Sequence, residues 1–217
     1  MKDNNIMNNR FIVVEGLDGS GKTTIVHKIV KYFYNQKITN VITTHEPGGT
    51  EIAYILSELI KNKSKNEKLT DLSELLMLYA ARSQLLENVI KPALFKGDWV
   101  IGDRCDLSSF AYQGAGRKLN SVLLNMLSQY VINDFFPKLI FYLDIPSELV
   151  LSRIKNRKVL DRIEQESLSF FNRVRSYYRK LAFLKENIIM IDASQPLEQV
   201  CVFIYRYLDQ WLCDLYK

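Results

Sequence analysis

The chain has 217 residues, 47% of them hydrophobic and 24% charged, and this balance excludes a disordered, collagen-like or mucin-like chain. Lys and Arg number 29 against 24 Asp and Glu, so the formal net charge is +5. A basic excess of this size is compatible with nucleic acid, an anionic membrane surface or small phosphorylated ligands as partners, and composition alone does not choose among them.

Taken in chain order, short apolar runs rich in β-branched and aromatic residues alternate with longer segments of helical period. The expected strands are Phe11–Glu15, Val41–Thr44, Trp99–Gly102, Leu139–Asp144 and Ile188–Ile191. The expected helices are Thr23–Asn35, Glu51–Ile60, Asp71–Ile90, Leu119–Ile132, Ser147–Asn156, Ile163–Lys185 and Leu197–Leu215. Strands that are apolar throughout and separated by helices predict a parallel sheet covered on both faces. We therefore expect an α/β fold of three layers, in a single domain over residues 1–217.

The cysteines, the length of the apolar runs and the first nine residues indicate the cellular compartment. Cys105, Cys201 and Cys213 are too few and too scattered for a disulfide framework or a CxxC metal site, and they favour reduced thiols in the cytoplasm. No apolar run approaches the roughly 20 residues that cross a bilayer. Residues 1–9 are polar and rich in Asn, so we expect a flexible leader rather than a signal peptide.

The strongest motif directly follows the first expected strand. The segment GLDGSGKT fits G-x-x-x-x-G-K-[ST], with a strand before it and a helix that begins inside it. Its glycines let consecutive N–H groups point at phosphate oxygens, and the helix N-terminus adds partial positive charge. Lys22 can bridge the β- and γ-phosphates, and the Thr23 hydroxyl can ligate Mg²⁺. The sequence therefore predicts a nucleoside triphosphate site formed by Gly16, Leu17, Asp18, Gly19, Ser20, Gly21, Lys22, Thr23 and Thr24.

The rest of the sequence indicates what happens to the γ-phosphate. An N/T-K-x-D segment, which a GTPase switch needs to read its base, does not occur, nor does an apolar strand that ends in Asp-Glu, as in motor ATPases. Instead, the third expected strand leads into Asp103-Arg104, a potential magnesium partner beside a phosphate-binding fork. This pair favours a kinase that acts on small phosphorylated molecules. A nucleotide switch without turnover and a nucleic-acid binder remain as alternatives.

Six motifs in order then make a specific resemblance. They are EGLDGSGKTT at 15–24, EPGGT at 46–50, YAAR at 79–82, GDR at 102–104, AYQG at 111–114 and LDRIE at 160–164. Together they resemble those of bacterial thymidylate kinases over nearly the whole chain, from residue 11 to beyond residue 190. The resemblance implies a P-loop NTPase fold, transfer of a phosphoryl group from ATP to dTMP with Mg²⁺, and dTDP as the product for dTTP synthesis. It also implies a homodimer formed through helices near 71–90, and no nucleic acid or membrane partner.

The same resemblance implies roles for single residues. Arg104 would bind the phosphate of dTMP, Arg82 would reach the thymine edge, and Tyr112 would lie against the deoxyribose and exclude a 2′-hydroxyl. Asp103 would join Thr23 near Mg²⁺, and Asp18 would approach the sugar hydroxyl and the magnesium shell. The residues assigned to the acceptor site are Pro47, Leu78, Arg82, Arg104, Ser108, Ser109, Tyr112 and Gln113. Three positions depart from the family pattern, namely His45, Leu78 and Cys105.

A basic segment at about 152–166 resembles the mobile lid of these kinases. Asp18 is followed by Gly19, so the phosphate-binding loop offers no guanidinium, and the resemblance implies that the lid supplies it. Arg157 is the first candidate for this catalytic arginine, and Arg153 and Arg162 are the alternatives. Nine basic and three acidic residues lie between positions 153 and 180, a local charge of +6, so the rest of the chain is nearly neutral at −1. We therefore expect the basic excess to meet triphosphate charge rather than a nucleic acid.

Overall fold

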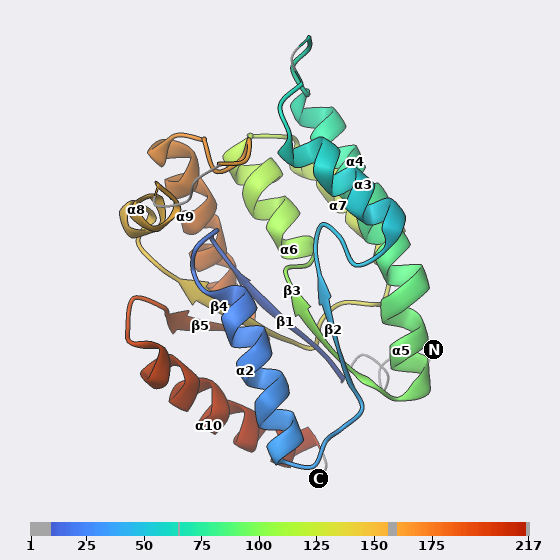
Figure 1. Cartoon of the computed structure of the whole chain (residues 1–217), viewed down its shortest axis with the longest axis vertical. Coiled ribbons are helices and arrows are strands. Elements are labelled where there is room, and N and C mark those ends of the chain that lie inside the picture. The colour runs from blue at the N-terminus through green and yellow to red at the C-terminus, as the bar shows by residue number, and fades with distance from the viewer. Residues whose placement is uncertain (1–9, 65, 156–159, 216–217) are drawn as a thin grey trace.

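The computed structural model describes residues 10–64, 66–155 and 160–215, and its strands form one parallel sheet (Figure 1). The strand order is β2-β3-β1-β4-β5. Their bounds are Phe11–Gly16 for β1, Val41–His45 for β2, Trp99–Asp103 for β3, Leu139–Asp144 for β4 and Ile188–Asp192 for β5. All five strands and the parallel α/β arrangement confirm the sequence predictions, with bounds that differ by at most one residue. The expected leader, residues 1–9, and the candidate Arg157 lie outside the described residues.

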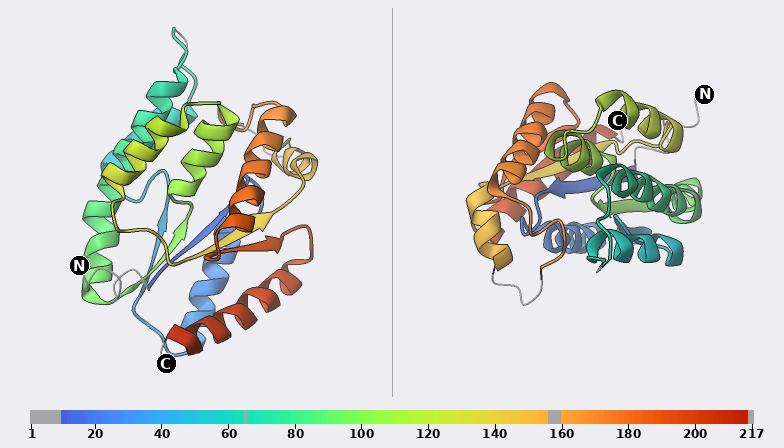
Figure 2. Two further views of the ribbon diagram at one scale, coloured as in Figure 1. Left: turned by 180° about the vertical axis from the view of Figure 1, so that it is seen from behind. Right: turned by 90° about the horizontal axis from the view of Figure 1, so that it is seen from above.

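Alternation along the strands divides the core into two layers, one on each face of the sheet. On β1, Phe11 and Val13 belong to one buried cluster, whereas Ile12 and Val14 belong to the other. Neighbouring side chains of a strand point to opposite faces, so a strand covered on both faces needs apolar residues at every position. The first layer is closed by helices α4 (Asp71–Leu85), α5 (Lys91–Lys96) and α9 (Leu168–Leu184), and the second by α2 (Lys22–Asn35) and α10 (Leu197–Leu215). Figure 2 shows the sheet between these layers.

The remaining helices are α3 (Glu51–Lys61), α6 (Asp106–Ser109), α7 (Ser121–Val131) and α8 (Ser147–Lys155). Two π-helical segments join them, η2 (Leu86–Ile90) after α4 and η3 (Phe110–Gly116) after α6. The helix expected at 71–90 therefore continues beyond its predicted end, through η2 into α5. In the described part of the chain, no helix is both long and apolar enough to cross a membrane.

The helix expected from Ile163 to Lys185 starts later than predicted. It begins at Leu168, because the hydroxyl of Ser167 accepts a hydrogen bond from the backbone N–H of Phe170 and caps it. Residues 161–166 form turns instead, in which the Asp161 carboxylate accepts from two backbone N–H groups. A second miss is the helical segment 106–116, whose apolar period was too short to predict a helix.

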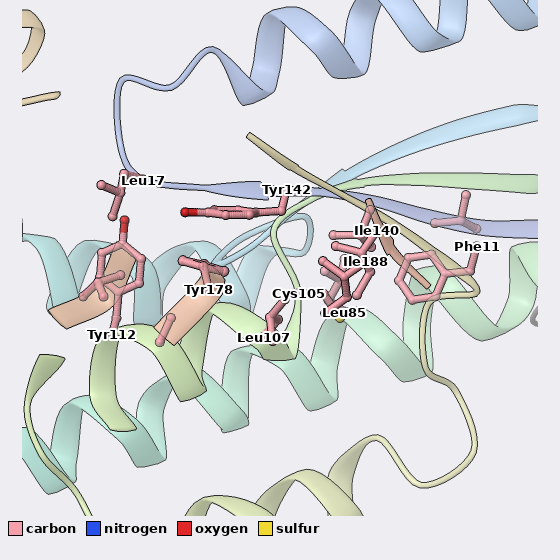
Figure 3. Close-up of a cluster of buried hydrophobic side chains, with 14 of the residues drawn as sticks. Phe11, Leu17, Leu85, Cys105, Leu107, Tyr112, Ile140, Tyr142, Tyr178 and Ile188 are labelled. Atoms are coloured by element: carbon pink, nitrogen blue, oxygen red, sulfur yellow. The ribbon is translucent and has the colours of Figure 1, made fainter. Parts of the chain in front are cut away.

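The strand registers bring three chain segments to the same edge of the sheet. Asp103 at the end of β3 lies opposite Val14 of β1 on one side and His45 of β2 on the other. The glycine-rich loop after β1, the Glu46-Pro47 segment after β2 and Arg104 after β3 therefore leave the sheet together. The first buried cluster extends beneath this edge, from Phe11 at one end to Leu17 and Tyr112 at the other (Figure 3). This is the carboxyl edge, where ligands of open parallel sheets bind.

Candidate active site

The loop between β1 and α2 has the conformation that the phosphate-binding motif predicts. Gly19 (φ +78°) and Gly21 (φ +96°) adopt the left-handed region, which side chains with a Cβ rarely occupy, and Gly21 precedes the first residue of α2. The ammonium of Lys22 is buried and donates to the carbonyl of Leu17 at 2.9 Å. Burial lowers the pKa of Lys22 to about 8, and the positive charge of Arg104 acts in the same direction. The loop therefore holds a lysine that an anion would stabilise in its charged form.

The two predicted magnesium residues meet at the first turn of α2. The hydroxyl of Thr23 donates to Oδ2 of Asp103 at 2.6 Å, although 80 residues separate them in the chain. Both side chains offer oxygen atoms, the donors that Mg²⁺ prefers, and both face the same cavity as the ammonium of Lys22. Two protein oxygens beside a phosphate-binding loop fit Mg²⁺, which proteins commonly hold with one or two side chains together with substrate phosphates. In the described residues, no three His, Cys, Asp or Glu side chains form a metal site of their own.

Arg104 forms the centre of a second group of side chains. Its guanidinium donates to Oδ1 of Asp18 at 2.6 Å, to the hydroxyl of Tyr112 at 3.2 Å and to that of Ser108 at 2.9 Å. Tyr112 in turn donates to Oδ2 of Asp18 at 3.0 Å. Burial opposes ionisation of Asp18, but the nearby charges of Arg104 and Lys22 outweigh it and hold the pKa of this carboxyl well below its usual range. Asp18 is thus a fixed negative charge that orients the guanidinium.

Arg82, on α4, is held by two buried carboxylates. Its Nε donates to Oε2 of Glu46 at 2.7 Å, and its Nη1 lies 3.3 Å from Oδ1 of Asp106. Its Nη2 donates to the hydroxyl of Ser109 at 3.0 Å, and the guanidinium lies 4.7 Å from the ring centre of Tyr79. Burial raises the pKa of Glu46 to about 7, and the positive charge of Arg82 works against that rise. The arginine is therefore fixed in place before any ligand arrives.

One cavity of about 710 Å³ connects these groups. The predicted residues that line it are Asp18, Gly19, Gly21, Lys22, Thr23, Thr24, Pro47, Leu78, Arg82, Asp103, Arg104, Ser108, Ser109, Tyr112 and Gln113. Pro47 follows a cis peptide bond. Gly16, Leu17 and Ser20 are buried and do not line the cavity, and the hydroxyl of Ser20 has no hydrogen-bond partner within the described part of the chain. A cavity of this volume is within the range of small-molecule and nucleotide sites.

The three residues that depart from the family pattern lie in two different places, the cavity and the core. His45 and Leu78 line the cavity, so both contribute to its surface. Cys105 is only 3% exposed and belongs to the apolar cluster in Figure 3. Its backbone, rather than its thiol, serves the site, because its N–H donates to Glu15 at 2.9 Å. The change at Cys105 is therefore a packing change in the core.

The two described lid arginines lie in different surroundings. Arg153 is on α8, and its Nη1 donates to the carbonyl of Gly19 in the phosphate-binding loop at 3.1 Å. Arg162 does not line the cavity: it donates from Nε to the carbonyl of Ile60 at 3.0 Å and pairs with the buried carboxylate of Glu74. Of these two arginines, Arg153 is the one that contacts the phosphate-binding loop.

The basic excess of α9 has a different use from the one that the sequence suggested. Arg175 binds the carboxylate of Asp144 through two hydrogen bonds, at 2.8 and 3.0 Å, and Arg179 binds it at 3.2 Å. Arg173 donates to the carbonyl of Gly116 at 2.7 Å and so closes the end of η3. These three arginines therefore stabilise the fold, and they bind groups other than the phosphate-binding loop that Arg153 contacts.

Sequence reasoning gave no role to two buried carboxylates that support the site. Glu15, inside the first motif, is fully buried and accepts hydrogen bonds from the Cys105 N–H and from the hydroxyls of Ser108 and Tyr178. Burial raises its pKa. Glu74, on α4, is equally buried and binds Arg117, Arg162 and Gln113. A Glu next to the loop glycine could have drawn attention to Glu15, but nothing in the helical pattern distinguishes Glu74 from an exposed residue.

Comparisons with known proteins point to one family over most of the chain. A family model described as thymidylate kinase matches residues 14–204. The thymidylate kinase of Blochmanniella pennsylvanica (strain BPEN) is 60% identical over 206 residues, which cover 94% of this chain and 97% of that protein. The crystal structure of thymidylate kinase from Ehrlichia chaffeensis is 30% identical, with a TM-score of 0.73, and the match covers 92% of this chain and 97% of that one.

Proposed function

This chain belongs to the thymidylate kinase family and phosphorylates dTMP to dTDP, and we propose how its residues divide that reaction between an ATP side and a dTMP side. The single observation that carries the division is the one continuous cavity, in which the phosphate-binding loop faces the Arg104 group. A donor phosphate on Lys22 and an acceptor phosphate on Arg104 would meet between these two cations. Positioning of two anionic substrates supplies much of the catalysis in phosphoryl transfer.

On the ATP side, we assign the triphosphate to residues 16–24. The backbone N–H groups of the glycine turn and Lys22 would bind its oxygens, and the fixed ammonium would neutralise charge as the γ-phosphoryl group moves. Thr23 and Asp103 would hold Mg²⁺, which supplies charge neutralisation at the phosphate oxygens when it is bound. The contact between these two oxygen donors supports this assignment.

On the dTMP side, we assign the phosphate to Arg104 and the base to the wall formed by Leu78, Arg82 and Ser109. Asp18 and Tyr112 hold the Arg104 guanidinium in its orientation. Arg82 is neutralised by Glu46 and Asp106, so it suits a neutral base edge better than a second phosphate. The remaining wall residues, Pro47, Ser108 and Gln113, would complete the acceptor pocket.

For the arginine that stabilises the transferring phosphoryl group, we keep Arg157 and Arg153 as candidates. Arg157 lies outside the described residues, so its assignment rests on the sequence. Arg153 is supported by its hydrogen bond to the carbonyl of Gly19, which sets it beside the phosphate-binding loop. An arginine at this place would neutralise charge that develops between donor and acceptor.

We further propose a homodimer through an apolar face of α3, α4 and α7, which Figure 1 and Figure 2 show side by side. Half-exposed or largely exposed apolar side chains follow one another at helical spacing along this face, namely Ile52, Ile55, Leu59, Leu72, Leu76, Val122, Met126 and Tyr130. Faces of this kind usually mark an association surface rather than a solvent-facing one. A second copy of the chain would cover it in isologous contact.

We also propose a cytoplasmic location for the protein. All three cysteines are free, which supports this location.

The test of the acceptor assignment is a panel of acceptors with the purified protein. Coupled production of ADP is measured with ATP, Mg²⁺ and either dTMP, dUMP, dCMP, dGMP or thymidine. We expect the largest kcat/KM for dTMP, with thymidine inactive because it brings no phosphate to Arg104. A preference for another monophosphate would contradict the assignment of the base wall.

A further inference from the structure

A buried carboxylate outside the proposed reaction path joins three chain segments around the acceptor cavity. Glu74 of α4 is 0% exposed. Its Oε1 accepts from the side-chain amide of Gln113 at 2.5 Å, and its Oε2 lies 3.1 Å from Nη2 of Arg117. The guanidinium of Arg162 binds the same Oε2. We call these four residues the Glu74 cluster.

The three partners of Glu74 come from two parts of the site. Gln113 belongs to η3 and lines the cavity, whereas Arg117 follows η3. Arg162 belongs to the turns at 161–166, where its two neighbours, Asp161 and Ile163, both line the cavity. Arg162 is also tied to α3, because its backbone N–H donates to the carbonyl of Lys61 at 3.0 Å and its Nε donates to that of Ile60. One carboxylate therefore connects two walls of the cavity.

The charge of Glu74 determines how its partners are oriented. An ionised carboxylate only accepts hydrogen bonds, so the amide of Gln113 must turn its nitrogen toward Glu74. Hydrogen bonds that involve charged groups are stronger than neutral ones, and their removal inside a protein leaves the partner charge uncompensated. A change at Glu74 would therefore release both Gln113 and the turn that carries Asp161 and Ile163.

We propose that Glu74 is a positioning residue that holds the Gln113 wall and the 161–166 turn in the arrangement that binds the dTMP acceptor. In this role Arg162 is the anchor of the turn rather than the arginine that meets the transferring phosphoryl group. The inference rests on the proposed placement of dTMP in this cavity. Its consequence is that the Glu74 cluster controls the KM for dTMP more than it controls kcat.

The experiment is a double-mutant cycle with Glu74→Gln, Arg162→Gln and the double variant, in the full chain. The kcat and the KM for dTMP and for ATP are measured together with the melting temperature. We expect each single variant to raise the KM for dTMP by about tenfold, with kcat changed by less than about threefold, since a lost contact of a charged group has this size. The double variant should be no worse than the poorer single variant, because both changes break the same contact.

Two further variants serve as a matched control and as a charge-conserving substitution. Asp71→Asn removes another carboxylate of α4, whose Oδ1 lies 3.5 Å from Nε of Arg117, without touching Arg162 or Gln113. We expect this matched control to leave the KM for dTMP within about twofold of wild type, because exposed pairs contribute little. Arg162→Lys retains the positive charge, so its KM for dTMP should lie between those of Arg162→Gln and the wild-type protein.

The outcomes separate the positioning role from a merely structural one. A fall in melting temperature with unchanged KM values would show that Glu74 only stabilises the fold and would overturn the proposal. Multiplicative effects in the double variant would also overturn it. If Glu74→Gln does not fold, the KM for dTMP of Arg162→Gln is compared with that of Arg162→Lys. In both of these variants Glu74 retains its contacts to Arg117 and Gln113, so the fold is less disturbed. Absence of dTMP turnover in the wild-type protein would instead count against the proposed function.

Discussion

The hydroxyl of Thr23 lies 2.6 Å from a carboxylate oxygen of Asp103, and this contact joins the phosphate-binding loop to the end of β3. It exists because β1 and β3 are neighbours in the sheet, with Val14 opposite Asp103. The helix that follows β1 therefore starts beside the strand end that carries the acid. Two oxygen donors that the chain separates by 80 residues thus become one candidate magnesium position.

The first prediction concerns that position. Asp103→Asn removes one anionic oxygen and should lower kcat by about 10- to 100-fold and raise the Mg²⁺ concentration that half-activates the enzyme. A Mg²⁺ titration of the initial rate measures both. Asp98→Asn, a change just before the opposite end of β3, is the control and should leave the titration unchanged. An unaltered Mg²⁺ requirement in Asp103→Asn would remove Asp103 from the metal site.

The second prediction concerns the pH dependence of ATP binding. The pKa of Lys22 is lowered to about 8 by burial, and a bound triphosphate would raise it by its negative charge. A group that gains affinity for a proton on binding takes the proton up, so binding is strongest below pH 8 and weakens as the pH rises above it. The Kd for ATP should increase by up to about tenfold per pH unit above pH 8, with one proton taken up.

Calorimetry at pH 8.5 in two buffers of different ionisation enthalpy measures this proton uptake. Lys22→Arg provides the control, since a guanidinium stays protonated at this pH. In that variant the observed enthalpy should no longer depend on the buffer. Equal enthalpies in both buffers for the wild-type protein would mean that Lys22 is already fully charged before ATP binds.

The third prediction separates the two sides of the cavity. Arg104→Ala removes the guanidinium that Asp18 and Tyr112 orient, and kcat/KM for dTMP should fall by about 100- to 1,000-fold because the acceptor phosphate loses charge-assisted hydrogen bonds. The Kd for ATP should change by less than about threefold, as Arg104 is assigned to the other substrate. Arg206→Ala, on the exposed side of α10, is the control. A parallel loss of ATP affinity would assign Arg104 to the donor side.

The fourth prediction compares two glycines of the same π-helical segment. A Cβ at Gly116 would lie 2.5 Å from Cε2 of Phe170 and 3.0 Å from Cγ2 of Val174, whereas a Cβ at Gly114 would meet Leu124 at an ordinary 3.6 Å. Gly116→Ala should lower the free energy of unfolding by about 1–3 kcal/mol through overpacking. Gly114→Ala should lie within about 1 kcal/mol of wild type. Urea denaturation measures both, and equal stability of the two variants would mean that α9 moves to accept the methyl group.

The fifth prediction tests the dimer face. Ile55 is 54% exposed at the middle of α3, and Ile55→Glu would place a charge in the proposed contact. We expect the wild-type protein to have the mass of two chains in solution, and the variant to have the mass of one. Light scattering after size-exclusion chromatography gives the mass. Phe183→Glu on α9, at an exposed apolar position away from this face, should stay dimeric, and a monomeric wild-type protein would refute the proposal.

The strands, the glycine-rich loop and the thymidylate kinase motifs could be predicted because each depends on neighbours in the sequence. An apolar run predicts a buried strand, and the spacing of Gly16, Gly21 and Lys22 is short enough to be visible as a pattern. One helix start was wrong: α9 begins at Leu168, five residues after the predicted start at Ile163, because Ser167 caps it there, whereas the apolar period alone predicts a longer helix. The basic segment was also only partly interpreted, since Asp144 neutralises Arg175 and Arg179.

The sequence by itself determined the fold class, the phosphate-binding loop and most residues of the cavity wall, because local patterns and motif spacing encode them. The tertiary structure alone decided which charged side chains pair with one another. Only the packing of α4 against the turns and η3 buries Glu74 and gives it Arg162, 88 residues away, as a partner. Burial removes water from such a carboxylate, so its partners follow from the chain topology rather than from neighbouring residues.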